Sequence, residues 1–425
     1  MTRAPAALGL CLALAAGAAG AVELDCGEFK FDFTPSVREV LTYTRELDAV
    51  DVFPPPGHPF SLGLSSSLLS LTRLRLDLQG RWGDHWSGQI TYDNELYLGD
   101  GRDSLAFRAA EAIGSPTFLD LDQTIVDSDD ATWRHLLYRG WLRYEDDDFD
   151  VTLGRQRIAL GRGRIWTPSD IFNLIPPLAV EADQRVGVDS LLARARVYDG
   201  LWASAIVAPE RHDHHPRSAL RLDLGERQLD AALMVAKIDR DYLLGADFAT
   251  NLWDAALRGE LTETWHGPAP SGGTLPGEAV PEGKATMQAV LSLDYTIAIG
   301  TGLYALVETF YNQDVAKPTP LTAVVQADVG LERLAQRLYL PQLVTFTHLQ
   351  TGFELGYDLT PLLRADLLYI QDWQGPSEAL VPSVTWNARS DLDLSIGVQL
   401  FGGNHGAGQY GGLAPLWFFR GDVYF

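Results

Sequence analysis

The sequence predicts an all-β protein: a transmembrane antiparallel β-barrel of about 18 strands (16–18), with short periplasmic turns and long extracellular loops. Three observations predict it. Apolar and polar residues alternate along most of the chain, connections between the alternating segments are short and long in turn, and an apolar leader precedes them. Side chains on a strand point to opposite faces in turn, so such alternation indicates strands with one apolar and one polar face.

The leader is residues 1–21. Arg3 supplies a positive start, residues 6–16 form a short apolar run, and residues 19–21 (AGA) fit a cleavage site. The apolar run is too short for a transmembrane helix. We therefore expect a signal peptide at 1–21 and a single barrel domain at 22–425.

Composition restricts the function classes. The 425 residues carry a net charge of −23, which argues against nucleic acid as a partner because phosphate binding needs a basic surface. Only Cys26 remains after leader cleavage, so no intramolecular disulfide is possible, and no haem-attachment motif or other cofactor motif is present. Four of the 33 basic residues are lysines and the rest are arginines, whose planar guanidinium suits carboxylate or phosphate.

The clearest alternation is in residues 72–82 (TRLRLDLQGRW), where leucines share one face and charged residues share the other. Residues 392–400 (LDLSIGVQL) repeat this pattern. An antiparallel sheet on a protein core would show it too, so alternation alone does not distinguish a core from lipid. The strands predicted from the whole chain are 34–47, 64–82, 86–98, 131–144, 149–159, 186–198, 201–209, 218–224, 228–238, 244–250, 254–265, 284–298, 303–313, 344–358, 362–373, 380–388, 392–402 and 416–425.

The last predicted strand favours lipid. In LWFFRGDVYF (416–425), Trp417, Phe419, Val423 and Phe425 share one face, which resembles the C-terminal insertion signal of bacterial outer-membrane barrels. Aromatic residues also flank two short turns, as in an interfacial girdle: Trp82, Trp86, Tyr144 and Phe149. We expect an integral protein of a Gram-negative outer membrane, in contact with lipid and lipopolysaccharide and inserted by the barrel-assembly machinery.

A barrel of this size encloses an aqueous or plugged lumen. With the apolar face outward, the arginines expected to line the lumen are Arg73, Arg75, Arg139, Arg143, Arg194, Arg196 and Arg221. The carboxylates expected there are Asp93, Glu95, Glu260, Asp294, Asp366 and Asp393. Rings of arginine favour anions; the alternative is that these charges pair across strands and only keep the wall solvated.

Residues 153–189 form the most distinctive segment. Its LGRQ start, its W-x-P-x-D centre (166–170) and its R-x-G-x-D end (185–189) resemble porin-like barrels of the alginate-export type, and also barrels that surround multihaem cytochromes. The resemblance implies passage of a hydrophilic solute or polymer through an arginine-lined pore. Stiffened by prolines, the segment is expected to fold into the mouth as a constriction that includes Arg155, Arg157, Arg162, Arg164, Trp166 and Asp170.

Two residues of this segment do not fit strict alternation. Arg155 and Arg157 have the parity of outward residues. Either a bulge at Gly154 turns them inward, which we favour, or they lie at the outer rim and face lipopolysaccharide phosphates.

Other candidate sites are weaker. Residues 211–216 (RHDHHP) could bind a transition metal and the acidic stretch 119–130 could bind calcium, but solvated loops are the default and no metal is expected. We expect His135 to line the lumen beside Arg139. With no nucleophile motif present, an enzyme is not expected.

The sequence thus favours a channel for hydrophilic, anionic solutes or a polysaccharide, with a periplasmic export partner in the latter case. The alternative is a barrel that surrounds a multihaem cytochrome. A third hypothesis, adhesion through the acidic loops, predicts a blocked lumen.

Overall fold

The computed structural model describes residues 22–44, 66–103, 107, 117–174, 176–184, 187–210, 216–267, 284–313, 315, 345, 347–403 and 408–425. The expected leader, residues 1–21, lies outside the described residues. In the described part of the chain, no helix is long and apolar enough to cross a membrane.

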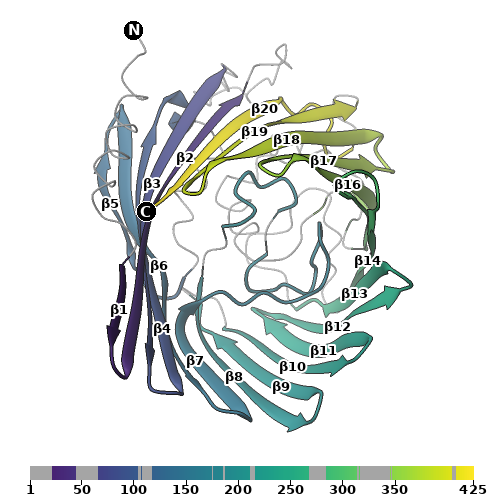
Figure 1. Ribbon diagram of the computed structural model, residues 1–425. Coiled ribbons are helices and arrows are strands. Elements are labelled where there is room, and N and C mark those ends of the chain that lie inside the picture. Colours follow the sequence, from purple (N-terminus) through teal and green to yellow (C-terminus); the bar gives the residue numbers. More distant parts are fainter. Residues whose placement is uncertain are drawn as a thin grey trace.

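The described strands form a closed antiparallel barrel of 18 strands, as the sequence predicted (Figure 1). Each strand pairs with the next barrel strand along the chain, and β20 pairs with β2 to close the ring. The barrel strands are β2 (Phe29–Thr44), β3 (Ser67–Trp82), β4 (Trp86–Leu98), β6 (Ala131–Glu145), β7 (Phe149–Gln156), β8 (Val188–Tyr198), β9 (Leu201–Ala208), β10 (Arg217–Glu226), β11 (Leu229–Ile238), β12 (Asp241–Leu252), β13 (Ala255–Trp265), β14 (Ala285–Ile297), β15 (Leu303–Asn312), β16 (Leu349–Thr360), β17 (Leu363–Asp372), β18 (Ser377–Arg389), β19 (Leu392–Gly403) and β20 (Leu416–Tyr424).

Two further strands lie beside the ring. β1 (Val22–Cys26) pairs with residues 29–33 of β2, which extend past the end of β20. β5 (Asp122–Asp127) pairs with the long-loop half of β6, where β7 no longer does. Neither strand is among those predicted from the sequence. Each one pairs with the part of a barrel strand that extends beyond the neighbouring barrel strand. This pairing is favourable because it leaves no backbone N–H and C=O groups of that strand edge unpaired.

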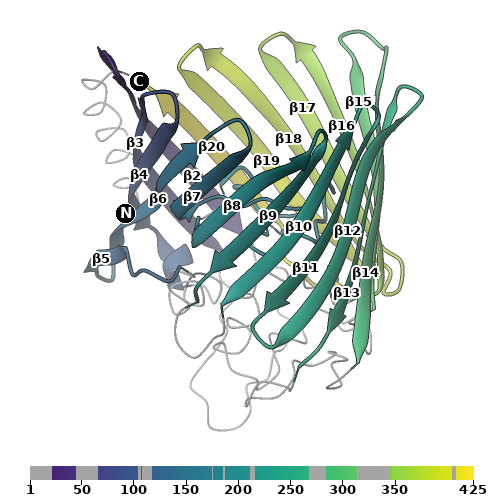
Figure 2. The same ribbon diagram turned by 90° about the horizontal axis from the view of Figure 1, so that it is seen from below.

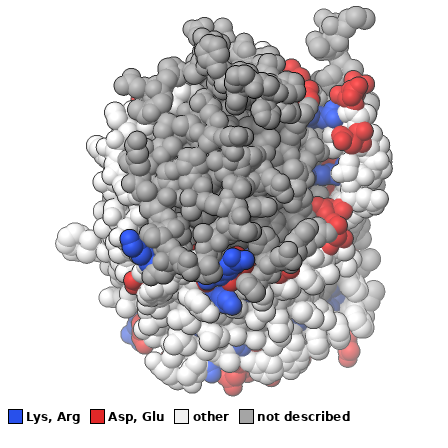
Figure 3. Space-filling model, turned by 180° about the vertical axis from the view of Figure 1, so that it is seen from behind, with Lys and Arg blue, Asp and Glu red and all other residues white. Residues whose placement is uncertain are grey.

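The two faces of the wall differ as the alternation predicted. The side chains of Leu153 and Ile396 are 63% and 57% exposed on the outer face. Outer-face aromatic rings form a continuous row at the short-turn end of β2–β7, in the order Phe31, Phe29, Trp82, Trp86, Tyr144 and Phe149, with neighbouring centroids 5.0–6.4 Å apart. In Figure 3, which shows the molecule from behind the view of Figure 1, acidic and basic side chains of the described residues lie in small neighbouring groups among uncharged residues.

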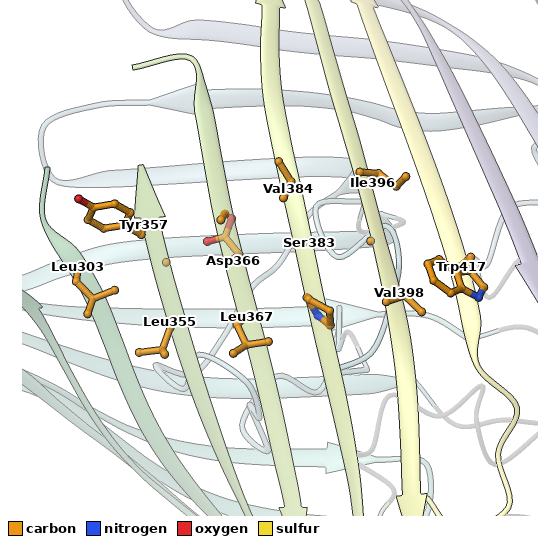
Figure 4. A pocket seen from close by; sticks show the side chains of 14 residues that line it. Leu303, Leu355, Tyr357, Asp366, Leu367, Ser383, Val384, Ile396, Val398 and Trp417 are labelled. Carbon is orange, nitrogen blue, oxygen red and sulfur yellow. The ribbon is translucent and has the colours of Figure 1, made fainter. Parts of the chain in front are cut away.

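The outer face of β15–β20 also carries an apolar groove (Figure 4). Its volume is about 580 Å³, and it passes between Leu355, Leu367, Ile396 and Trp417. Pro382 lies at its centre, where the small ring fills less space than its neighbours. The groove is separate from the lumen.

A bulge in β6 changes which residues face inward. Thr91 pairs with Arg139 and the next residue of β4, Tyr92, pairs with Leu137, so Tyr138 is an extra residue. Even-numbered residues of β6 therefore face the lumen before the bulge, and odd-numbered residues face it after the bulge. The expectation that His135 lines the lumen is wrong: its ring contacts Tyr92 on the outer face, with a distance of 2.8 Å from Nδ1 to the tyrosine oxygen.

Candidate functional site: a loop across the lumen

The segment between β7 and β8, residues 157–187, is called the constriction loop, and its described residues (157–174, 176–184 and 187) lie inside the barrel (Figures 1 and 2). Its contacts reach walls far apart around the ring. The Glu181 carboxylate accepts a hydrogen bond from Arg73 of β3 at 2.6 Å, and the Leu178 carbonyl accepts one from Gln399 of β19 at 2.7 Å. On the other side, Arg162 donates to Asp247 of β12 at 3.1 Å. The loop therefore spans the lumen.

Two wall glutamates hold the centre of the loop. Glu260 of β13 and Glu308 of β15 are 4% and 0% exposed, and each accepts three backbone N–H groups of the loop. The donors to Glu260 are the amides of Arg162 (2.5 Å), Gly163 (2.5 Å) and Ser169 (3.0 Å). The donors to Glu308 are the amides of Arg164 (2.7 Å), Ile165 (2.9 Å) and Trp166 (2.7 Å). Neither carboxylate forms an ion pair with another described residue, so amide dipoles compensate both charges.

Apolar contacts complete the attachment. The Trp166 ring, 1% exposed, stacks on Phe310 of β15 with centroids 5.7 Å apart. Ile158, Ile171 and Phe172 pack on the inner face of β8–β12. The inner-wall residues in that cluster are Val188, Ile206, Ala208, Ala219, Met234, Ala236, Ile238 and Leu243. Trp166 therefore anchors the loop rather than facing the open lumen.

The sequence analysis assigned the inner face to polar residues and missed this apolar region. The available signal was the loss of alternation in 201–208 (LWASAIVA) and 229–238 (LDAALMVAKI), which are apolar on both faces. Strands covered on both sides show such continuous apolar runs.

The predicted lining residues of β3, β4, β6, β8, β10, β14 and β19 face inward, and most of their arginines are paired. Arg75 makes two hydrogen bonds of 2.7 Å to Asp93, and Arg73 donates to Glu95 at 2.7 Å. The other pairs are Arg143 with Glu145 and Asp150, Arg194 with Asp150, Arg196 with Asp148 and Asp199, Arg221 with Asp223 and Asp247, and Asp294 with Arg258. Asp393 accepts from Asn387 at 2.6 Å, and Asp366 pairs with Arg364. This is the arrangement expected if the wall charges largely neutralise one another.

A polar cavity of about 440 Å³ lies in the lumen between β2, β3, β4, β6, β20 and the constriction loop. Tyr138, the bulge residue, contributes its ring, and the guanidinium carbons of Arg75 and Arg139 lie 3.9 and 4.2 Å from its centroid. Such distances allow cation–π attraction. At the loop side of this cavity, Asp183 accepts from Arg38 at 2.8 Å. Burial alone would raise the pKa of Asp183, but the hydrogen bond and charge of Arg38 lower it to about 2.

The prediction that Arg155 belongs to the constriction is wrong, because its side chain is buried in the barrel wall. β7 pairs in continuous register with β8 through Gly154, so no bulge turns Arg155 inward, and the side chain does not face lipopolysaccharide either. It is 1% exposed within the wall, where Nε lies 3.0 Å from Asp189. Its two terminal nitrogens donate to the carbonyls of Leu137 and Leu119 at 2.7 Å. Arg155 thus joins β6, β7, β8 and the segment before β5 at the point where β6 changes partner.

The remaining predicted loop residues divide into two groups. Asp170 is buried and accepts the Asn173 amide at 3.0 Å, so it shapes a turn, while Arg162 is paired with Asp247. Arg157 and Arg164 are exposed, and neither guanidinium forms an ion pair or hydrogen bond with another residue in the described part of the chain.

Of the two sequence-predicted metal candidates, only the acidic stretch 119–130 lies in the described part of the chain. Residues 211–215 lie outside the described residues. Within the acidic stretch, Asp122–Asp127 form β5, and Asp127 lies 3.6 Å from Arg102. No group of three or more histidine, cysteine or acidic residues in the described ranges is arranged to hold a metal ion.

Comparison with solved structures identifies the fold. No protein-family model and no curated protein matches this chain. OccAB1 of Acinetobacter baumannii is similar in structure (TM-score 0.54, 13% identity, 93% of this chain and 96% of that one covered). OccK8 (OprE) of Pseudomonas aeruginosa is similar to the same degree (TM-score 0.54, 9% identity, 93% and 97% covered). The chain has the fold of outer-membrane porins.

Proposed function

We propose that this protein is an outer-membrane channel through which small hydrophilic anions diffuse. The observation that carries the proposal is the constriction loop, which spans the lumen and presents Arg157 and Arg164, exposed and outside any ion pair with a described residue. The wall arginines, by contrast, are largely neutralised by neighbouring carboxylates. Any preference for anions therefore comes mainly from the loop, because an unpaired cation in a narrow polar channel attracts anions most strongly.

The comparisons support a solute of this class. One structure with the same fold, OpdK of Pseudomonas aeruginosa, was solved with vanillate, a carboxylate (TM-score 0.50, 8% identity, 92% of this chain and 98% of that one covered). The row of outer-face aromatic rings supports a position in a membrane. Integration in the outer membrane after loss of residues 1–21, with assembly by the barrel machinery and contact with lipopolysaccharide, belongs to this proposal.

Two alternatives fit the lumen less well. A multihaem cytochrome inside the barrel would need the space that residues 157–187 cross. A polysaccharide, with or without a periplasmic export partner, would have to thread past the same loop. Both alternatives require the loop to leave its wall contacts, whereas diffusion of small anions does not.

The test is the reversal potential of the purified barrel in a planar bilayer under a potassium chloride gradient. We expect anion preference in the wild type and its loss in Arg157→Ser/Arg164→Ser. The matched control is Arg227→Ser/Arg389→Ser, which removes two exposed arginines at the short-turn end. A double loop variant that keeps wild-type preference would refute the assignment, and a wild type that conducts no ions would refute the channel.

A further inference from the structure

We propose that Glu260 and Glu308 are positioning residues that set the width of the lumen, because they fix the constriction loop to the wall through its backbone amides. The inference rests on the proposed channel function, but its structural part does not. Neither residue touches solute in this account. Both act through the position of loop residues 162–169.

The hydrogen-bond geometry uses the whole of each carboxylate. One oxygen of Glu260 accepts two amides and the other accepts one, and the same division holds for Glu308. An ionised carboxylate is the one side-chain group that offers two acceptor oxygens and no donor. Hydrogen bonds to a charged acceptor are about twice as strong as neutral ones. Six of them within eight residues make this the most strongly held part of the loop.

The sequence of the loop fits this role. Gly163 brings its amide to 2.5 Å from Glu260, and an added Cβ there would lie 1.9 Å from the Trp166 carbonyl oxygen. Gly161 has φ +84°, and its added Cβ would lie 2.6 Å from the Glu260 carboxylate. A side chain at either position would collide with the carboxylate or with the loop backbone, so both positions require glycine. The two glycines, Gly161 and Gly163, therefore serve the attachment of the loop.

Both charges are also buried without an ion-pair partner among the described residues, which makes the attachment reciprocal. A buried carboxylate that lost its amide donors would be left uncompensated at high cost. The loop backbone likewise has no other acceptor in its described contacts for these six N–H groups. Loop and wall therefore release each other together rather than one bond at a time.

The test is Glu260→Gln/Glu308→Gln, in which each glutamine keeps the shape but replaces one acceptor oxygen by an NH₂ donor that faces a backbone N–H. Hydrogen–deuterium exchange of the intact barrel measures the amides of 162–169 directly. We expect exchange there to be at least about tenfold faster than in the wild type, the factor that corresponds to losing one strong hydrogen bond. We also expect a larger single-channel conductance.

The control removes a glutamate without touching the loop. Glu263→Gln neutralises an exposed carboxylate on the opposite face of β13. It should keep wild-type exchange at 162–169. Gly163→Ala should loosen the loop without changing any charge, so it supports the proposal if a glutamine variant fails to fold, as judged by heat-modifiable gel mobility.

The outcomes separate the two proposals. Unchanged exchange at 162–169 in both the glutamine and the alanine variants would overturn the positioning role, even if the wild type conducts anions. Faster exchange at 162–169 in the variants, combined with a wild-type barrel that carries no current, would support the positioning role and refute the channel.

Discussion

Replacing Arg155 by methionine should destabilise the barrel far more than replacing an arginine of an exposed wall ion pair. The guanidinium is 1% exposed and its partner Asp189 is 7% exposed, so methionine would leave a buried carboxylate without its cation. Removing one partner of a buried pair typically costs about 3–5 kcal/mol. The carbonyls of Leu137 and Leu119 would lose their donors as well.

The matched control is Arg196→Met. Arg196 pairs with Asp148, but these side chains are 34% and 77% exposed, and an exposed pair contributes only about 0.2–1 kcal/mol. Urea unfolding of both variants in lipid vesicles, followed by tryptophan fluorescence and gel mobility, measures the free energies of unfolding. If the free energy of unfolding fell no more in Arg155→Met than in Arg196→Met, burial would not govern the strength of these ion pairs and the reasoning would fail.

Three further predictions test other parts of the structure. Trp166→Ala should weaken the loop anchor by about 3–5 kcal/mol, because a large buried side chain leaves a cavity, and faster hydrogen exchange of the loop amides would show it; unchanged exchange would contradict the anchoring role. The ion pair between Asp183 and Arg38 should be fully formed above about pH 4, the ordinary pKa of an aspartate in the unfolded chain, and lost as the pH falls through the folded-state pKa of about 2. Conductance recorded from about pH 8 to pH 2 should therefore change only at the acidic end. A step near neutrality would contradict this. Ile396→Arg on the outer face should cost about 2–4 kcal/mol of stability in lipid vesicles, whereas Gln79→Arg on the inner face should cost little, and equal costs would mean that the faces are wrongly assigned.

Most of the wall could be predicted because a membrane barrel has a simple rule. Each strand needs an apolar face toward lipid, so most barrel strands show period-two alternation, and the eighteen predicted segments correspond to the eighteen barrel strands. β1 and β5 could not be found this way. They lie beside the ring and pair with one strand each, so the alternation that lipid imposes on barrel strands is not imposed on them.

The inner surface was harder to predict, because its residues contact other protein segments rather than one uniform medium. Inward orientation of Arg73 and Arg75 followed from alternation, but their carboxylate partners depend on cross-strand register. Register also moved His135 to the outer face through the bulge at Tyr138. The role of Arg155 depends on where β7 ends, which no local pattern reveals.

The loop itself was expected inside the barrel from its prolines and its composition. What holds it there was not, because Glu260 and Glu308 look like ordinary inward carboxylates in their strands. Only the three-dimensional structure shows that backbone amides, rather than arginines, neutralise them.

The most direct test of the central claim, that the loop arginines face the ion path, is charge replacement at one of them. In a Cys26→Ser background, Arg164→Cys places a single thiol on the constriction loop. We predict that a sulfonate thiosulfonate reagent lowers anion preference in single-channel recordings and that a trimethylammonium reagent restores it. Equal currents and equal selectivity with both reagents would contradict the account.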